Sequence, residues 1–166
     1  MVIKKSKIRS RRGMTLVGTM VAVTILLIAL IGTSSFRYSA ALDGRKAKAQ
    51  TAAARIALML CESWRGINGD VTFNPIQLCG SDLIIETLDA NLDMPLDFNL
   101  LGSYAVTLEP KESYNINYYA TLSWKDVQPG LRALNVVLAW AQRDLGIDGV
   151  QGVDKSFRLT IYTQTF

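Results

Sequence analysis

Residues 14–31 form a long apolar run near the start of the chain. They read MTLVGTMVAVTILLIALI, and none of their side chains is charged. An α-helix of this length measures about 27 Å, which is close to the roughly 30 Å of hydrocarbon that a bilayer presents. The run therefore predicts a helix that can span a membrane.

Helical chemistry continues beyond this run as far as residue 65. Residues 32–35 are weak helix formers and mark the place where a long helix would loosen most easily, but residues 36–65 are rich in alanine. Apolar side chains recur there every three or four residues, at Ala53, Ile56, Leu60 and Trp64. This spacing predicts that the second half of the helix buries one face against a core.

The pattern changes after Gly66. Residues 66–103 carry a high density of turn signals, such as Asn74-Pro75. They predict a region that connects the helix to a sheet and contains at most short elements. Within it, the segment 82–88 fits a short strand and a short helix equally well.

Residues 104–166 alternate between apolar and polar side chains with the period of two that strands require. Four strands are predicted, and their apolar positions are Tyr104, Val106 and Leu108; Tyr114, Ile116, Tyr118, Ala120, Leu122 and Trp124; Leu134, Val136, Leu138 and Trp140; and Phe157, Leu159 and Ile161. Thr121 and Ser123 lie on the opposite face of the second strand. The turn signal Pro129-Gly130 predicts that the two middle strands are antiparallel neighbours.

The predicted fold class is therefore α+β, with a long N-terminal helix packed on a roughly four-stranded antiparallel sheet. Five segments follow from the pattern: 1–13, a basic leader; 14–35, the transmembrane half of the helix; 36–65, its amphipathic half; 66–103, the connecting region; and 104–166, the sheet. Trp124 and Trp140 are interpreted as core residues rather than as a ligand platform.

Charge is concentrated at the N-terminus. Six of the 18 basic residues precede Gly13, whereas no acidic residue does. Without that segment 12 basic and 14 acidic residues remain, a net charge of −2, so no basic surface is predicted for binding nucleic acid. The same asymmetry places residues 1–13 in the cytoplasm and the residues after Gly32 on the other side of the membrane.

The chain contains no histidine. This absence excludes a Ser-His-Asp triad, a Cys-His pair and any zinc site built on imidazole. No phosphate-binding loop, dinucleotide fingerprint or nucleophile motif is present either. We therefore expect the protein not to be an enzyme and to need no cofactor.

Cys61 and Cys79 are separated by 17 residues and are predicted to lie outside the cytoplasm, where disulfides form and persist. A bridge between them would pin the end of the helix to the connecting region and stabilise the fold by about 3 kcal/mol. The alternative is two unpaired buried thiols, because a pair of cysteines carries no information about geometry.

The residues from Arg11 to Val17, followed by the apolar run, resemble the prepilin-type cleavage and methylation motif of type IV pilins and type II secretion pseudopilins. In that family a prepilin peptidase on the cytoplasmic face cuts after a glycine, methylates the new N-terminal amine and leaves the apolar helix on the mature protein. The resemblance implies cleavage between Gly13 and Met14 and methylation of Met14. Thr15, Leu16 and Val17 match the next motif positions.

Gly18 departs from this pattern, because the family usually carries a glutamate as the fifth residue of the mature chain. That carboxylate is thought to meet the N-terminal amine of a neighbouring subunit inside the apolar filament core, where an unpaired charge is costly. Pilin-like proteins without it occupy the filament tip, which implies a position at or near the tip. The alternative is that Gly18 is tolerated in a subunit held by other contacts.

Three segments of the predicted sheet, 123–126, 137–140 and 157–162, are similar to minor pilins of the pilus-modification type. The resemblance implies a minor pilin or pseudopilin that begins as a single-pass inner-membrane precursor and then enters a type IV pilus or a type II secretion pseudopilus. The implied partners are other pilin or pseudopilin subunits bound through the N-terminal helix, the prepilin peptidase, an inner-membrane assembly platform and membrane lipid. A rival hypothesis is a bitopic membrane protein that never polymerises, keeps residues 1–13 and displays a periplasmic binding domain.

The segment 142–156 contains Asp144, Asp148 and Asp154 among three glycines. Carboxylates in such a loop can wrap a calcium ion, and some related pseudopilins hold calcium between strands. The spacing does not match an EF-hand, so the favoured interpretation is a solvated turn without metal.

Overall fold

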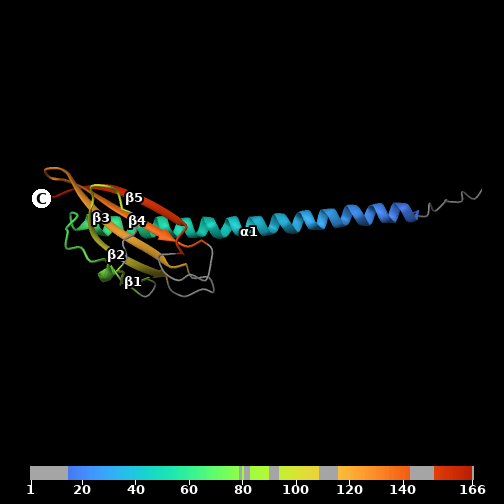
Figure 1. Cartoon of the computed structure of the whole chain (residues 1–166), viewed down its shortest axis with the longest axis horizontal. Coiled ribbons are helices and arrows are strands. Elements are labelled where there is room, and N and C mark those ends of the chain that lie inside the picture. The colour runs from blue at the N-terminus through green and yellow to red at the C-terminus, as the bar shows by residue number, and fades with distance from the viewer. Residues whose placement is uncertain are drawn as a thin grey trace, which may run out of the picture. The chain divides into compact units, whose positions relative to one another are not determined.

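A computed structural model describes residues 15–78, 80, 83–89, 94–108, 116–142 and 152–165. Helix α1, Leu16–Gly66, is followed by the short 3₁₀ helix η1, Pro75–Leu78, and then, in the described residues, by strands (Figure 1). The strands are β1, Leu83–Thr87; β2, Asn99–Leu108; β3, Tyr118–Gln128; β4, Leu131–Trp140; and β5, Lys155–Gln164. The chain divides into two compact units, Met1–Gly44 and Arg45–Phe166, and α1 contributes to both.

The sheet belongs to the second unit and is a simple antiparallel meander. Its strand order, β1-β2-β3-β4-β5, follows the chain. The α+β class is therefore confirmed, but the predicted count of four strands is wrong. The fifth strand is β1, within the segment 82–88 that the sequence left undecided, because its five residues bury only Ile85 and are too few to show a period.

The hairpin between β3 and β4 was predicted correctly. Pro129 and Gly130 form the turn, and Gly130 has a φ of 78°, which glycine adopts without strain. Strand β3 continues past its predicted end at Trp124 to Gln128, and β4 begins at Leu131. The polar residues beside the turn are therefore part of the ladder rather than of a loop.

Helix α1 ends in a left-handed cap. The Gly69 N–H donates to Trp64 O at 3.0 Å, and Asn68 and Gly69 have φ values of 58° and 68°. A Cβ on Gly69 would lie 2.8 Å from Thr163 Cγ2 and 3.1 Å from Leu134 Cδ2. Glycine is therefore favoured at this position for two reasons, its left-handed backbone conformation and its close approach to side chains of the sheet.

The core of the second unit lies between α1 and one face of the sheet. The four helix residues predicted to face it are all buried, as are most of the apolar positions predicted on β3 and β4. The hydroxyl of Tyr118 on β3 donates to the helix carbonyl of Ala49 at 3.2 Å, and burial raises the pKa of that phenol. Trp140 is buried and Trp124 packs partly buried against the same core, as predicted.

The opposite face of the central strands is also buried. Thr121 and Ser123, which the sequence placed on this face, and Asn135 have no exposed surface. Asn135 Nδ2 donates to Ser123 Oγ at 3.1 Å, and Thr160 Oγ1 donates to Asn135 Oδ1 at 3.0 Å. These cross-strand bonds satisfy Asn135 and Ser123 and connect β3, β4 and β5, whereas the buried hydroxyl of Thr121 has no hydrogen-bond partner.

Candidate functional site

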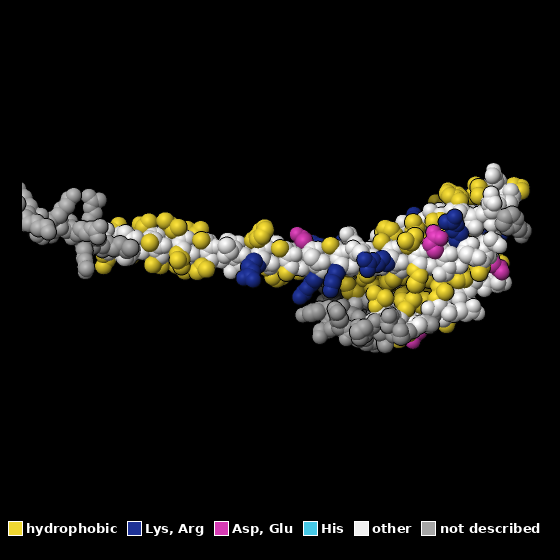
Figure 2. All heavy atoms as spheres, turned by 180° about the vertical axis from the view of Figure 1, so that it is seen from behind, with side chains coloured by type: hydrophobic (Ala, Val, Ile, Leu, Met, Phe, Trp, Pro, Cys, Tyr) yellow, Lys and Arg dark blue, Asp and Glu magenta, His cyan; other side chains and the backbone are white. Residues whose placement is uncertain are grey.

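The first candidate site is the part of α1 that belongs to the first unit. Every residue from Thr15 to Gly44 is exposed, including the large apolar ones, and the N-terminal apolar stretch stands out in Figure 2. The helix contains an 18-residue window with a mean hydropathy of 2.4, of which 0% is buried within the protein. By length and composition α1 can cross a membrane, and its exposed apolar surface requires an apolar partner or lipid.

Three threonine hydroxyl groups in this segment donate hydrogen bonds to carbonyl groups of the helix itself. Thr19 Oγ1 donates to Leu16 O at 2.7 Å, and Thr24 Oγ1 donates to Met20 O at 2.9 Å. Thr33 Oγ1 lies 3.0 Å from the carbonyl oxygens of both Ala29 and Leu30. Threonines bonded in this way expose little unsatisfied polarity to hydrocarbon, so they do not disqualify the segment from a bilayer.

Thr15 caps the start of the helix. Its Oγ1 accepts a hydrogen bond from the Gly18 N–H at 3.3 Å, and its carbonyl accepts one from the Thr19 N–H at 3.1 Å. Gly18 has an ordinary helical backbone, and a Cβ there would meet Thr15 Oγ1 at 3.3 Å and nothing closer. A larger residue at position 18 thus requires only a small movement of the threonine, so the fold of the chain does not explain this glycine.

The other motif residues are distributed as follows. Leu16 and Val17 lie in the first turn of α1 and are 77% and 69% exposed. Gly13 and Met14 lie outside the residues that the structure describes. The predicted cleavage and methylation sites remain predictions.

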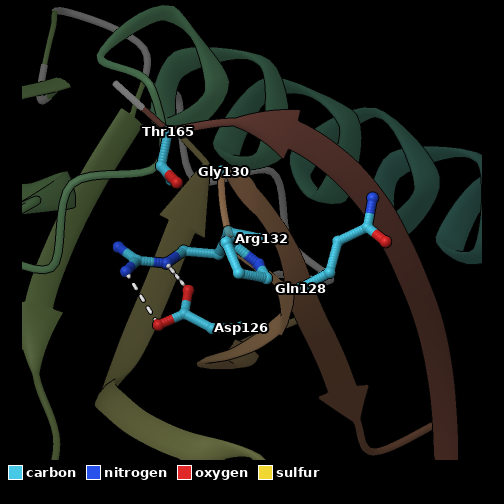
Figure 3. Close-up of a pocket in the computed structure, with 6 residues that line it drawn as sticks. Asp126, Gln128, Gly130, Arg132 and Thr165 are labelled. Carbon is cyan, nitrogen blue, oxygen red and sulfur yellow. Dashed lines mark hydrogen bonds and ion pairs between the residues drawn. The ribbon is translucent and has the colours of Figure 1, made fainter.

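A second candidate site, which the sequence did not indicate, surrounds Arg132 beside the β3–β4 turn. The Arg132 Nε donates to Asp126 Oδ1 at 2.7 Å, and one terminal nitrogen of the same guanidinium donates to Asp126 Oδ2 at 3.2 Å (Figure 3). The other terminal nitrogen donates to Gly69 O at 2.8 Å, and the guanidinium carbon lies 4.3 Å from the ring centroid of Trp124. The sequence did contain a signal for this pair. Asp126 and Arg132 have opposite charges and lie on either side of the predicted turn at Pro129-Gly130, where the two strands of a hairpin face each other.

An open cavity of about 390 Å³ adjoins this cluster and is lined by Asp126, Gln128, Pro129, Gly130, Arg132 and Thr165. Its carboxylate and guanidinium are paired with each other, and no thiol, hydroxyl nucleophile with a base, or group of carboxylates lines it apart from these. The arrangement fastens the end of α1 to the sheet.

Cys61 lies on the buried face of α1 and is a free thiol in this structure. Burial, with a smaller contribution from the neighbouring Glu62, raises the pKa of the thiol to about 12. Such a group is a poor nucleophile. Cys79 lies outside the described residues, so the disulfide between the two is not shown and stays a prediction.

The acidic segment 142–156 is only partly described. Asp154 Oδ1 accepts a hydrogen bond from the Gln142 N–H at 2.7 Å, which fixes the carboxylate against the end of β4. Asp144 and Asp148 lie outside the described residues, where the calcium hypothesis remains untested. Among the residues that are described, no group of three His, Cys, Asp or Glu side chains could hold a metal ion.

Comparisons with known proteins add no identification, since no protein-family model, no curated protein and no solved structure matches this chain. The functional argument consequently depends on the residues themselves.

Proposed function

We propose that this protein is a minor pilin or pseudopilin subunit, made as a membrane-anchored precursor, cut after Gly13 and assembled into a thin helical filament through its apolar helix. The observation that carries the proposal is the exposed apolar first half of α1, continuous with a second half that packs on an antiparallel sheet. A subunit of this kind exchanges lipid contacts for helix contacts on assembly.

The segment before the helix supports the same proposal. A basic leader, a glycine and an uncharged run occur in the order that a prepilin peptidase recognises, and Thr15 caps the helix directly after the proposed new N-terminus. The absence of a carboxylate at Gly18 supports a position at or near the filament tip, where no subunit ahead requires that partner. The proposal covers both types of filament, a pilus and a secretion pseudopilus.

The decisive experiment is intact-mass analysis and N-terminal sequencing of the membrane-extracted protein, made with and without a prepilin peptidase. We expect a chain that begins at N-methylated Met14 only when the peptidase is present. Gly13→Leu should block this processing. Gly32→Leu is the matched control, because a side chain at position 32 meets nothing within 4 Å. An uncut chain that retains residues 1–13 in every sample would favour the bitopic display protein.

Position in the filament is tested with a label on the exposed surface of the second unit. We expect labelled wild-type protein at filament ends only. Gly18→Glu should spread the label along the shaft, because it restores the carboxylate that can pair with the N-terminal amine of the subunit ahead. Label along the shaft of the wild-type filament would show that Gly18 is tolerated there and would contradict the tip position.

A further inference from the structure

Two aromatic residues and an arginine follow the uncharged part of α1 in the first unit. Phe36 and Tyr38 are 75% and 68% exposed, and they flank Arg37, whose side chain is also exposed. Residues 32–35, which are glycine, threonine and serines, separate these three from the apolar run. Large aromatic side chains with this much exposed surface indicate a contact outside the chain.

Arg37 has no charged neighbour in the sequence. It is the only charged residue between Gly13 and Asp43, and Asp43 is the first acidic residue of the chain. Within the described residues the Arg37 side chain makes no hydrogen bond or ion pair. All the N–H donors of its guanidinium are therefore available to a ligand.

The position of these residues along α1 matches the edge of a bilayer. From Leu16 to Phe36 the helix rises about 30 Å, which is the thickness of hydrocarbon in a typical bilayer. When the apolar run fills the hydrocarbon, Phe36, Arg37 and Tyr38 reach the headgroup region on the side opposite the basic leader. Aromatic side chains are enriched at that level in membrane proteins. This step rests on the membrane anchor of the proposed function.

The three side chains surround the helix instead of forming one face. Successive residues of an α-helix are rotated by about 100°, so Phe36, Arg37 and Tyr38 together cover more than half of its circumference. A single partner helix would contact residues that are about three or four positions apart on one face. Lipid headgroups lie on all sides of a membrane helix and can contact all three residues at once.

We propose that Phe36, Arg37 and Tyr38 form a binding site for phospholipid headgroups in the leaflet opposite the basic leader. The Arg37 guanidinium donates to phosphate oxygens, and the two rings lie at the boundary between headgroups and acyl chains. A planar guanidinium can donate to two phosphate oxygens together, and the two groups have opposite charges. The site fixes the depth of the first unit in the membrane.

A second copy of this chain offers Arg37 a poorer partner. Residues 14–42 contain no carboxylate, so two such segments packed in register bring only like charges together. Asp43, the first carboxylate that follows, already has an interaction of its own. The phosphate of a lipid supplies the negative charge that this segment lacks.

Lipid binding is tested on the full chain in detergent micelles, with phosphatidylglycerol as the probe and native mass spectrometry as the measurement. We expect Arg37→Gln to weaken the apparent affinity about tenfold, because hydrogen bonds between charged groups are lost. Lys48→Gln is the matched control, since it removes the same charge from the second unit, and its affinity should stay near the wild-type value. Diglucosyl diacylglycerol, which has no phosphate, should bind wild type and Arg37→Gln alike.

Several results would overturn the headgroup site. Equal losses in Arg37→Gln and Lys48→Gln would reduce the binding to general charge. A loss of diglucosyl diacylglycerol binding in Arg37→Gln would show that phosphate is not what the arginine contacts. Displacement of phosphatidylglycerol by inorganic phosphate would reassign the residues to a soluble anion, and no binding to wild type would remove the site altogether.

The depth of the segment is measured in phosphatidylglycerol vesicles with the variants Ile25→Cys, Ile31→Cys and Leu42→Cys, each without the two native cysteines. An impermeant thiol reagent on both sides of the membrane should label Leu42→Cys only. Labelling of Ile31→Cys with Ile25→Cys protected, or protection of Leu42→Cys, would place the interface elsewhere and overturn the headgroup site alone. Labelling of Ile25→Cys would overturn the membrane anchor as well. None of these results depends on cleavage after Gly13.

Discussion

Replacing Arg132 by methionine removes three interactions at once: the ion pair with Asp126, the hydrogen bond to Gly69 O and the stacking on Trp124. We expect the free energy of unfolding to fall by about 2 kcal/mol, because the hydrogen bond to the carbonyl is partly buried. Urea unfolding of the full chain in micelles, followed by tryptophan fluorescence, measures the change.

Asp126→Asn provides the comparison for this prediction. Asp126 is about half exposed, so the ion pair alone is worth less than about 1 kcal/mol. The asparagine variant keeps the contacts of Arg132 with Gly69 and Trp124. A loss as large as that of Arg132→Met would show that the ion pair, rather than the attachment of α1 to the sheet, supplies the stability.

The stability of the protein should also depend on the protonation of Cys61. Burial raises the pKa of the thiol from 9.0 to about 12 in the folded state, so folding favours the protonated form. This contribution is complete below pH 9 and is lost as the pH rises toward 12. In a Cys79→Ser variant, which isolates the thiol, we expect the urea midpoint to decline above pH 9.

The control for the pH prediction is the same variant with Cys61→Ala added. Alanine does not titrate, so its midpoint should lack the part of the alkaline decline that belongs to the thiol. Parallel declines in the two proteins would attribute the effect to other groups. The predicted disulfide is tested on the wild-type protein unfolded in urea. Cysteines that react with a thiol label only after reduction would show that the disulfide is present.

At the scale of elements, two glycines test how the α1 cap and the β3–β4 turn are built. Gly69 and Gly130 both have positive φ, but only Gly69 is crowded, with a Cβ position 2.8 Å from Thr163 Cγ2. We expect Gly130→Ala to cost about 1 kcal/mol and Gly69→Ala about 3 kcal/mol in the free energy of unfolding. Thermal unfolding followed by circular dichroism compares them. Equal losses would mean that the cap shifts to relieve the contact.

Elements with a strong period were predictable and those without one were not. The second half of helix α1 and strands β3 and β4 have apolar residues at regular spacing, and the structure places most of those residues in the core. Strand β1 has one buried residue and depends on pairing with β2. Its hydrogen bonds come from residues about 20 positions away, which no local pattern records.

At the scale of the whole molecule, a membrane-spanning first half of α1 predicts that substitutions at two similarly exposed leucines affect membrane insertion differently. Leu26 and Leu58 both lie on α1 and are 60% and 52% exposed. Leu26→Lys should weaken membrane insertion by about 3 kcal/mol, because it puts a charge in the middle of the apolar run. Leu58→Lys should have no effect on insertion.

Carbonate extraction of membranes measures the fraction of each variant that stays inserted. A protein whose apolar helix faced water would tolerate both substitutions alike, so equal extraction of the two variants would contradict the membrane assignment. The result also tests the proposed function, since a filament subunit of the proposed kind must first be held in the membrane.

The membrane-spanning capacity, the long helix, the buried helix face and the alternation of β3 and β4 could all be read from the linear chain, because each depends on neighbours within a few turns or residues. Folding added relations between distant positions, namely the hydrogen bond from Arg132 to Gly69 and the cross-strand bonds that connect Ser123, Asn135 and Thr160. These depend on which strands become neighbours and on what then lies against them. The hydrophobic period carries no information about these relations. It shows which face of a helix or strand a residue lies on, but not which other residue contacts it.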